Sequence, residues 1–208
     1  MPKKGSLEVI CGCMFSGKTS ELIRRLERAQ FANLKIQAFK SHHDMRYGAK
    51  GLRTHSGASY PAISVPNSSS EDLRRLLDRS QDILAIDEVQ FFDDGIVGLC
   101  EELANNDIKI IVAGLDLDFR GEPFPGPTVA KYYLHPMAAL MCKADRLDKL
   151  TAACTICGEE ATRSQRLING QPANWDELVL VVGALDAYEA RCSLHHFIKS
   201  PTLPSNLI

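Results

Sequence analysis

Residues 12–19 read Gly-Cys-Met-Phe-Ser-Gly-Lys-Thr, which fits the pattern G-x-x-x-x-G-K-[ST] of a phosphate-binding loop. The apolar run Leu7–Cys11 precedes this loop as a predicted strand, and an amphipathic helical pattern follows it. Gly12 and Gly17 allow backbone angles at which successive N–H groups face one anion, and the helix N-terminus adds positive potential. The strand–loop–helix order therefore favours a nucleotide-binding loop over a chance match in a glycine turn.

This loop predicts particular contacts with ATP and magnesium. The amino group of Lys18 is expected to reach the β- and γ-phosphates, and the Thr19 hydroxyl is expected to ligate Mg²⁺. The expected ATP contacts are Gly12, Cys13, Met14, Phe15, Ser16, Gly17, Lys18 and Thr19, together with Asp87, Glu88, Val89 and Gln90 from a later segment.

A second acidic segment closes the apolar run Asp82–Asp87 about seventy residues after the loop. A carboxylate at the end of a buried strand beside such a loop can hold Mg²⁺, which is the role expected of Asp87. The neighbouring Glu88 could accept a proton from an attacking hydroxyl or water. Acids are also common at solvated strand ends, and only the pairing with the loop favours the functional interpretation.

Strand and helix patterns alternate over the first 115 or so residues. The continuous apolar runs are typical of strands covered on both faces. This alternation predicts the α/β class, with a parallel sheet flanked by helices. The expected strands are Leu7–Cys11, Lys35–Phe39, Tyr60–Val65, Asp82–Asp87 and Lys109–Leu115. Three helices are expected in this part. The first has Leu22, Ile23, Leu26 and Ala29 on one face, the second has Leu73, Leu76 and Leu77 as its buried stripe, and the third spans about Ile96–Ala104.

The character of the chain changes after Asp116. Residues 116–128 are rich in Gly, Pro and aromatic residues and predict a long ordered loop, and a helix is expected near Val129–Ala144. We expect an ATP-binding domain over 1–146, a small metal-binding domain over 147–198 and a tail over 199–208.

Three cysteines and a histidine form two half-sites, Cys154-x-x-Cys157 and Cys192-x-x-His195. This spacing fits a tetrahedral zinc site, and four protein ligands leave no position for catalysis, which predicts a structural zinc ion. His196 competes for the fourth place, although the spacing favours His195. A redox C-x-x-C is the other interpretation, and the matching second half-site argues against it.

Bulk properties exclude some functions. The 208 residues carry a formal net charge of −2, which offers no basic surface for a nucleic-acid backbone. No apolar run approaches the roughly 18 residues needed to span a bilayer, and Glu8 interrupts any signal sequence. Seven cysteines, an odd number, do not suggest a disulfide framework. A cytoplasmic protein without membrane or nucleic-acid partners is expected.

Several segments together resemble the type II thymidine kinases. They run in order across nearly the whole chain: GCMFSGKTSEL from Gly12, DMRY at 44–47, RTHSG at 53–57, IDEVQFF at 86–92, GLDLDFRGEPF at 114–124 and the two zinc half-sites. The combination is far more specific than the phosphate-binding loop alone.

This resemblance implies a RecA-like domain with a small zinc domain, whose lasso loop corresponds to about residues 159–188. It implies transfer of the γ-phosphoryl group of MgATP to the 5′-hydroxyl of thymidine or deoxyuridine, for pyrimidine deoxynucleoside salvage. Glu88 would be the catalytic base. A homotetramer and feedback inhibition by dTTP are also implied. The implied substrate contacts are Met14, Asp44, Arg46, Phe91, Leu115, Phe119, Phe124, Thr162, Val179, Leu180, Val181, Val182 and Tyr188.

Two other functions share these features. A nucleic-acid-dependent ATPase with a zinc ribbon would use the same loop, acids and zinc, but the net charge and the short chain disfavour it. A non-catalytic nucleotide sensor leaves Glu88 without a role. The aromatic residues could also be ordinary core residues, which is their commoner role.

Overall fold

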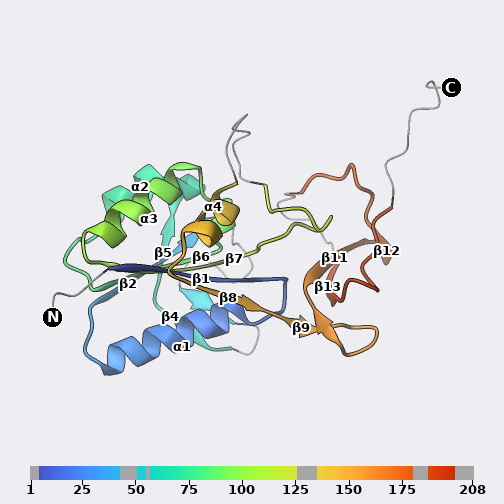
Figure 1. Cartoon of the computed structure of the whole chain (residues 1–208), viewed down its shortest axis with the longest axis horizontal. Coiled ribbons are helices and arrows are strands. Elements are labelled where there is room, and N and C mark those ends of the chain that lie inside the picture. Colours follow the sequence, from blue (N-terminus) through green and yellow to red (C-terminus); the bar gives the residue numbers. More distant parts are fainter. Residues whose placement is uncertain (1–4, 43–50, 55–56, 126–134, 180–186, 200–208) are drawn as a thin grey trace, which may run out of the picture.

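The computed structural model describes residues 5–42, 51–54, 57–125, 135–179 and 187–199 (Figure 1). A parallel six-stranded sheet forms its centre, in the order β5-β2-β6-β7-β1-β8. The expected parallel sheet is thereby confirmed. Its strands are β1 Ser6–Gly12, β2 Ile36–Ser41, β5 Ile63–Val65, β6 Ile83–Asp87, β7 Lys109–Gly114 and β8 Arg146–Leu150.

Helices cover both faces of this sheet (Figure 1). On one face lies α1 Lys18–Phe31, which buries Leu22, Ile23 and Leu26 as its pattern predicted. On the other face lie α2 Ser70–Leu76, α3 Gly95–Asn105 and α4 Pro136–Lys143. Each face has its own apolar cluster, which is why the central strands carry apolar side chains at consecutive positions.

Two of the predicted helices differ from the sequence expectation. Ser69 caps α2 by accepting N–H bonds from Glu71 and Asp72. The helix ends at Leu76, so only Leu73 is fully buried, while Leu76 on the last turn is 40% exposed. The expected three-leucine stripe was therefore wrong at Leu76.

The helix expected near Val129–Ala144 is shorter in the structure. It begins at Pro136, whose fixed φ and missing N–H suit a first helical position, and it follows an extended His135. Residues 129–134 lie outside the described part of the chain. The expected strand Tyr60–Val65 is likewise interrupted after Tyr60, where Pro61 removes a backbone donor.

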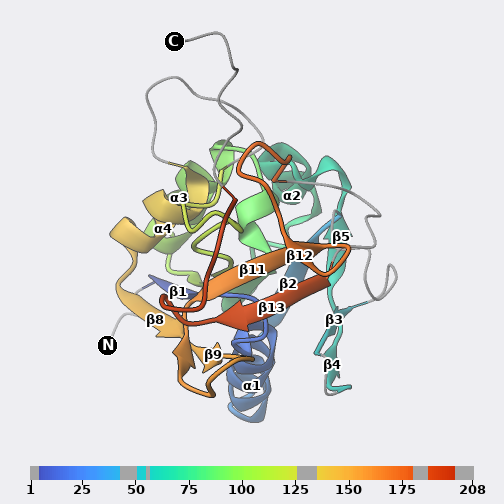
Figure 2. The same ribbon diagram turned by 90° about the vertical axis from the view of Figure 1, so that its right-hand side faces the viewer.

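The remaining strands are short and antiparallel. β3 Leu52–Arg53 pairs with β4 Ser59–Tyr60. Beyond β8 lies the small β region: β9 Ala152–Ala153, β10 Glu160–Ala161, β11 Arg163–Ile168, β12 Gln171–Pro172 and β13 Ala187–Arg191. Figure 2 shows this region in front of the main sheet, at the end where the parallel strands finish. The domain division at 146–147 stays a prediction, and β8 spans that position.

None of the helices among the described residues is long and apolar enough to cross a bilayer.

One cation joins α1 to the neighbouring strands β1 and β8 of the sheet. The Arg25 guanidinium lies 2.8 Å from Glu8, 2.8 Å from Glu21 and 2.6 Å from Asp148, and its side chain is only 9% exposed. The hydrogen bond from Arg25 is the largest cause that lowers the pKa of Asp148 below its ordinary value. Arg25 therefore links the three carboxylates to one another, while each also pairs with a second cation: Lys109 for Glu8, Arg24 for Glu21 and Arg146 for Asp148.

We expect Arg25→Met to lower the free energy of unfolding at pH 7 by about 2 kcal/mol, because it leaves three partly buried carboxylates without that partner. A carboxyl whose pKa is depressed by folding stabilises the native state above its unfolded pKa and loses this effect as the pH falls. The difference from the unsubstituted protein should therefore shrink below about pH 4. Urea unfolding at several pH values measures it.

Arg24→Met is the matched control, since Arg24 is 55% exposed and bonds only Glu21 among the described contacts. It should lower the free energy of unfolding much less than Arg25→Met does, because an exposed ion pair is screened by solvent. Equal losses in the two variants would contradict the role assigned to Arg25.

Candidate active site and metal centre

The phosphate-binding loop leaves the carboxyl end of β1, between β7 and β8. Gly12 has φ 141°, and a Cβ there would lie 2.3 Å from the Leu150 carbonyl oxygen, so only glycine fits. Gly17 has φ 83° and precedes α1 directly. Both glycines are therefore needed by the backbone, as the sequence pattern predicted.

Lys18 lies beneath the loop. Its amino group donates to the Cys13 carbonyl at 2.8 Å, and burial lowers its pKa against the opposing charges of Glu88 and Asp87. Ser16 Oγ donates to the same carbonyl at 2.8 Å. The Lys18 ammonium is thus held inside the loop and close to the acid pair.

The acid pair meets the loop at the end of β6. Thr19 Oγ1 donates to Asp87 Oδ2 at 3.0 Å, which joins the two residues expected to hold Mg²⁺. Asp87 is 4% exposed, and burial, with a smaller contribution from the Glu88 charge, raises its pKa to about 7. A divalent cation beside this carboxylate would favour its ionised form.

Glu88 has a left-handed backbone, with φ 53° and ψ 42°. Such a conformation is costly for a residue with a side chain and often occurs at functional sites. Gln90 Nε2 donates to Glu88 Oε2 at 2.5 Å, and Gln90 Oε1 accepts the Leu115 N–H at 3.0 Å. Gln90 therefore links the Glu88 carboxylate to the backbone just after β7.

The Gly/Pro-rich loop brings aromatic residues close to this acid. The rings of Phe91 and Phe124 meet edge to face, with centroids 5.6 Å apart. Phe124 is 5% exposed and its N–H donates to the Asp116 carbonyl. Phe119, five residues earlier in the same loop, is 3% exposed. The loop thus supplies apolar walls near the end of β7.

The small β region contacts the phosphate-binding loop directly. Ser164 Oγ accepts the Met14 N–H at 3.0 Å, and Cys13 Sγ donates to the Ala161 carbonyl at 3.3 Å. Residues from β10 and β11 therefore join the same site.

The remaining expected substrate contacts are only partly described. Met14, Leu115, Thr162, Val179 and Tyr188 are half-buried, and the Thr162 hydroxyl accepts a bond from Arg163 at 3.1 Å. Asp44, Arg46, Leu180, Val181 and Val182 lie outside the described residues.

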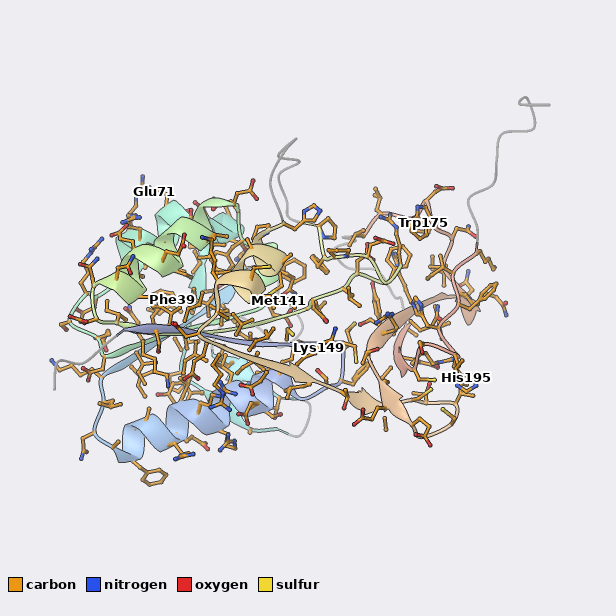
Figure 3. All side chains as sticks on the ribbon, viewed as in Figure 1. Phe39, Glu71, Met141, Lys149, Trp175 and His195 are labelled. Atoms are coloured by element: carbon orange, nitrogen blue, oxygen red, sulfur yellow. The ribbon has the colours of Figure 1, made fainter. Side chains whose placement is uncertain are left out.

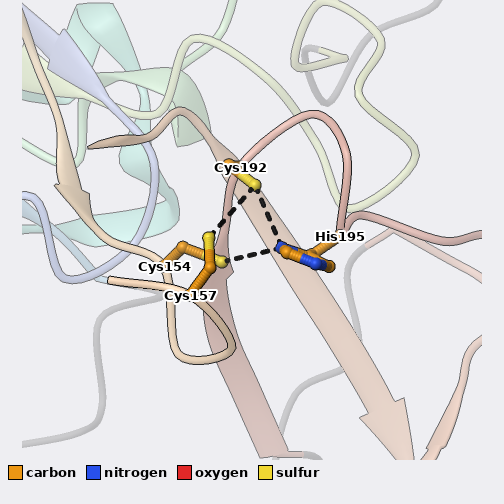
Figure 4. Close-up of side chains that lie close together, drawn as sticks. All are labelled: Cys154, Cys157, Cys192 and His195. Atoms are coloured by element: carbon orange, nitrogen blue, oxygen red, sulfur yellow. Dashed lines mark hydrogen bonds between the residues drawn. The ribbon is translucent and has the colours of Figure 1, made fainter. Parts of the chain in front are cut away.

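The four expected metal ligands come together in the small β region (Figure 4). The Cys192 Sγ lies 3.3 Å from His195 Nδ1, Cys154 Sγ lies 3.7 Å from the same nitrogen, and the Sγ atoms of Cys157 and Cys192 are 3.8 Å apart. A tetrahedral zinc ion with Zn–S of about 2.3 Å places neighbouring ligand atoms roughly 3.5–3.8 Å apart. The donor set and its spacing therefore fit zinc.

His196 takes a different role from His195. Its Nε2 bonds the Phe119 carbonyl at 2.9 Å, and burial lowers its pKa. The structure thus places His195, and not His196, in the metal-binding group.

The metal centre and the phosphate-binding loop share one apolar cluster. Cys13 packs with the ligands Cys154 and Cys192 and with Ala161 and Ala190. The identity of residue 13 is therefore constrained by the small β region as well as by the loop.

Sequence reasoning missed Ser164 and the pair Asp116–Lys149. Lys149 Nζ lies 2.8 Å from Asp116 Oδ2, although the two buried Asp116 carboxylate oxygens accept no well-directed hydrogen bond from the described residues. An aspartate directly after the apolar run of β7, at the edge where the loop and Asp87 lie, was the available signal for Asp116. Ser164 carried no comparable signal, because it is one of several polar residues in a short strand.

The parallel sheet, the loop and the buried acid pair together define a P-loop nucleotide-binding protein. The family model described as thymidine kinase matches residues 5–196. A thymidine kinase of Coprothermobacter proteolyticus is 47% identical over 201 residues, which covers 96% of this chain and 94% of that protein. The chain belongs to the thymidine kinase family.

Two solved structures align with the chain at much lower sequence identity. The flagellar accessory protein FlaH of Methanocaldococcus jannaschii aligns over 76% of each chain, with 16% identity and a TM-score of 0.43. Domain III of the Thermotoga maritima replication initiation protein DnaA aligns over 72% of this chain and 56% of its own, with 15% identity and a TM-score of 0.39. These values are too low to indicate a shared activity.

We expect Cys154→Ser to reduce bound zinc well below one ion per chain and to lower the melting temperature, because a structural site contributes its binding free energy to folding. Zinc content by mass spectrometry and thermal unfolding measure the two effects. Cys142→Ser is the matched control, since Cys142 is exposed and lies outside the cluster. Unchanged zinc content in Cys154→Ser would contradict the assigned ligand.

Proposed function

We propose that this protein transfers the γ-phosphoryl group of MgATP to the 5′-hydroxyl of thymidine, or of deoxyuridine, giving the nucleoside monophosphate. The observation that carries the proposal is the position of Glu88, a carboxylate held by Gln90 beside Lys18 and the Thr19–Asp87 pair. Membership of the thymidine kinase family supports the choice of nucleoside.

The proposed nucleotide site comprises the loop and the acid pair. Backbone N–H groups of residues 12–19 bind the phosphates, and Lys18 compensates negative charge at the transferred group. Thr19 and Asp87 would hold Mg²⁺, which supplies charge compensation between the phosphates. Asp87, Glu88, Val89 and Gln90 complete the contacts from the end of β6.

Glu88 is the proposed general base. In its deprotonated form the carboxylate accepts the proton of the 5′-hydroxyl as the oxygen bonds to phosphorus and the bond from phosphorus to the ADP oxygen breaks. Gln90 restricts the direction of the carboxylate through its bonds to Glu88 and Leu115. Little other covalent chemistry is required of the protein, because phosphoryl transfer depends mainly on positioning and charge.

The pyrimidine site is proposed at the aromatic walls. Phe91, Phe119 and Phe124 are apolar surfaces suited to a flat base. Met14 lies within the phosphate-binding loop, and Leu115 directly follows β7. The other proposed contacts are Asp44, Arg46, Thr162, Val179, Leu180, Val181, Val182 and Tyr188.

Zinc at Cys154, Cys157, Cys192 and His195 is proposed to be structural, since four protein ligands complete a tetrahedron. A homotetramer and feedback inhibition by dTTP are proposed from the resemblance to type II thymidine kinases. A cytoplasmic location is proposed from the sequence pattern alone.

Purified protein with MgATP should consume ATP only when thymidine or deoxyuridine is added, and dTMP should appear in equal amount with ADP from thymidine. Coupled ADP detection and chromatography of the nucleotides measure both products. Consumption that depends on DNA would instead support the zinc-ribbon ATPase. ATP binding without any turnover would support the nucleotide sensor.

Glu88→Gln should lower kcat by a factor of order 10² or more, because the amide cannot accept the hydroxyl proton. Nucleotide affinity, measured by calorimetry, should change little, since the loop and Thr19 remain. Glu101→Gln, on the exposed side of α3, is the control and should keep full turnover. Near-normal kcat in Glu88→Gln would exclude a general base at this position.

A further inference from the structure

Two arginines lie against one aromatic ring of the proposed nucleoside site. The guanidinium carbon of Arg120 is 5.1 Å from the centroid of Phe119, and that of Arg166 is 5.3 Å from the same centroid. Phe119 itself is 3% exposed. The ring therefore has cationic neighbours from its own loop and from strand β11.

The same two guanidinium groups bind the main chain of residues 175–178. Arg120 Nε donates to the Trp175 carbonyl at 2.8 Å and Arg120 Nη2 to the Glu177 carbonyl at 2.7 Å. Arg166 Nη1 donates to the Leu178 carbonyl at 2.6 Å. Three nearly consecutive carbonyl groups are thus held by two side chains that also contact Phe119.

Neither arginine is a freely moving surface side chain. Arg166 is 2% exposed and lies in β11, opposite Tyr188 of β13. Arg120 follows Asp118, whose buried carboxylate accepts the N–H groups of Arg120 and Glu122 and lies 3.7 Å from the Arg120 guanidinium. Burial therefore restricts the Arg166 side chain, and the nearby Asp118 carboxylate restricts that of Arg120.

We propose that Arg120 and Arg166 are positioning residues of the nucleoside site, which together form an arginine clamp that fixes Phe119 relative to residues 175–178. The inference rests on the proposed function, because it treats Phe119 as a wall for the pyrimidine. The clamp sets the distance between this wall and Val179, the next residue of the chain. It acts on nucleoside affinity and not on the phosphoryl step.

Arginine is required at both positions for a physical reason. Arg120 donates two directed bonds and Arg166 one directed bond to residues 175–178 while each guanidinium also contacts the Phe119 ring. A lysine ammonium cannot make both kinds of contact with this geometry. The carbonyl acceptors also offset the cost of burying a charge at Arg166.

The kinetic test uses Arg120→Lys and Arg166→Lys, which keep the charge and remove the fork. We expect the KM for thymidine to rise about tenfold in each, while the KM for ATP stays within about twofold. Arg79→Lys is the control, because Arg79 is 55% exposed and pairs with Glu102 away from this site. An unchanged thymidine KM in both folded variants, or an equal rise in both KM values, would overturn the proposal.

A second measurement does not depend on turnover. Trp175 is the only tryptophan of the chain, is 36% exposed, and lies 5.7 Å from the Arg120 guanidinium in the small β region (Figure 3). Arg120→Lys should shift its emission to longer wavelength and increase quenching by acrylamide, and Arg79→Lys should not. Unchanged emission in Arg120→Lys would refute the clamp.

The two measurements separate the clamp from the proposed function. If the unsubstituted protein shows no thymidine-dependent turnover, the proposed function fails, and with it the assignment of the clamp to a nucleoside site. An altered Trp175 emission would then leave the clamp as a structural contact only. Normal turnover with unchanged emission and KM values would reject the clamp and keep the kinase.

Discussion

The hydrogen bond between Thr19 and Asp87 joins two segments that are 68 residues apart in the chain. It exists because β1 and β6 are parallel and finish at the same edge of the sheet, with β7 between them. Lys18, Glu88 and the start of the Gly/Pro-rich loop lie at the same edge. Each group of the proposed active site therefore depends on the parallel order of β6, β7 and β1. If β6 were elsewhere in the sheet, Asp87 and Glu88 would be separated from the phosphate-binding loop.

This arrangement includes several features that cost folding free energy. Asp87 and Lys18 are buried, which raises the pKa of the acid and lowers that of the amine, and Glu88 has a left-handed backbone. The surrounding contacts hold these groups in place: Thr19 on Asp87, and Gln90 between Glu88 and Leu115. Such groups are poised for a charged ligand, because phosphates and a divalent cation would compensate the charges that burial disfavours.

The small β region is connected to the sheet at its functional edge. Cys13 packs among metal ligands, Ser164 bonds the N–H of Met14, and His196 bonds the carbonyl of Phe119. A metal ion bound by Cys154, Cys157, Cys192 and His195 would therefore also support the backbone of the phosphate-binding loop.

The sequence alone determined the parallel α/β class, the loop at 12–19, the acid pair and the Cys/His cluster that could hold a metal, because each depends on local spacing or on burial of a continuous apolar run. It did not determine that Leu76 of α2 is exposed or that Gln90 bonds the Glu88 carboxylate. Nor did it determine that Ser164, Asp116 and Lys149 lie at the site. Those features arise from contacts between residues far apart in the chain, such as Met14 with Ser164. Packing between distant elements decides them: the small β region against the phosphate-binding loop for Ser164, and the main sheet with its helices for the others. No local sequence pattern encodes which distant groups will meet.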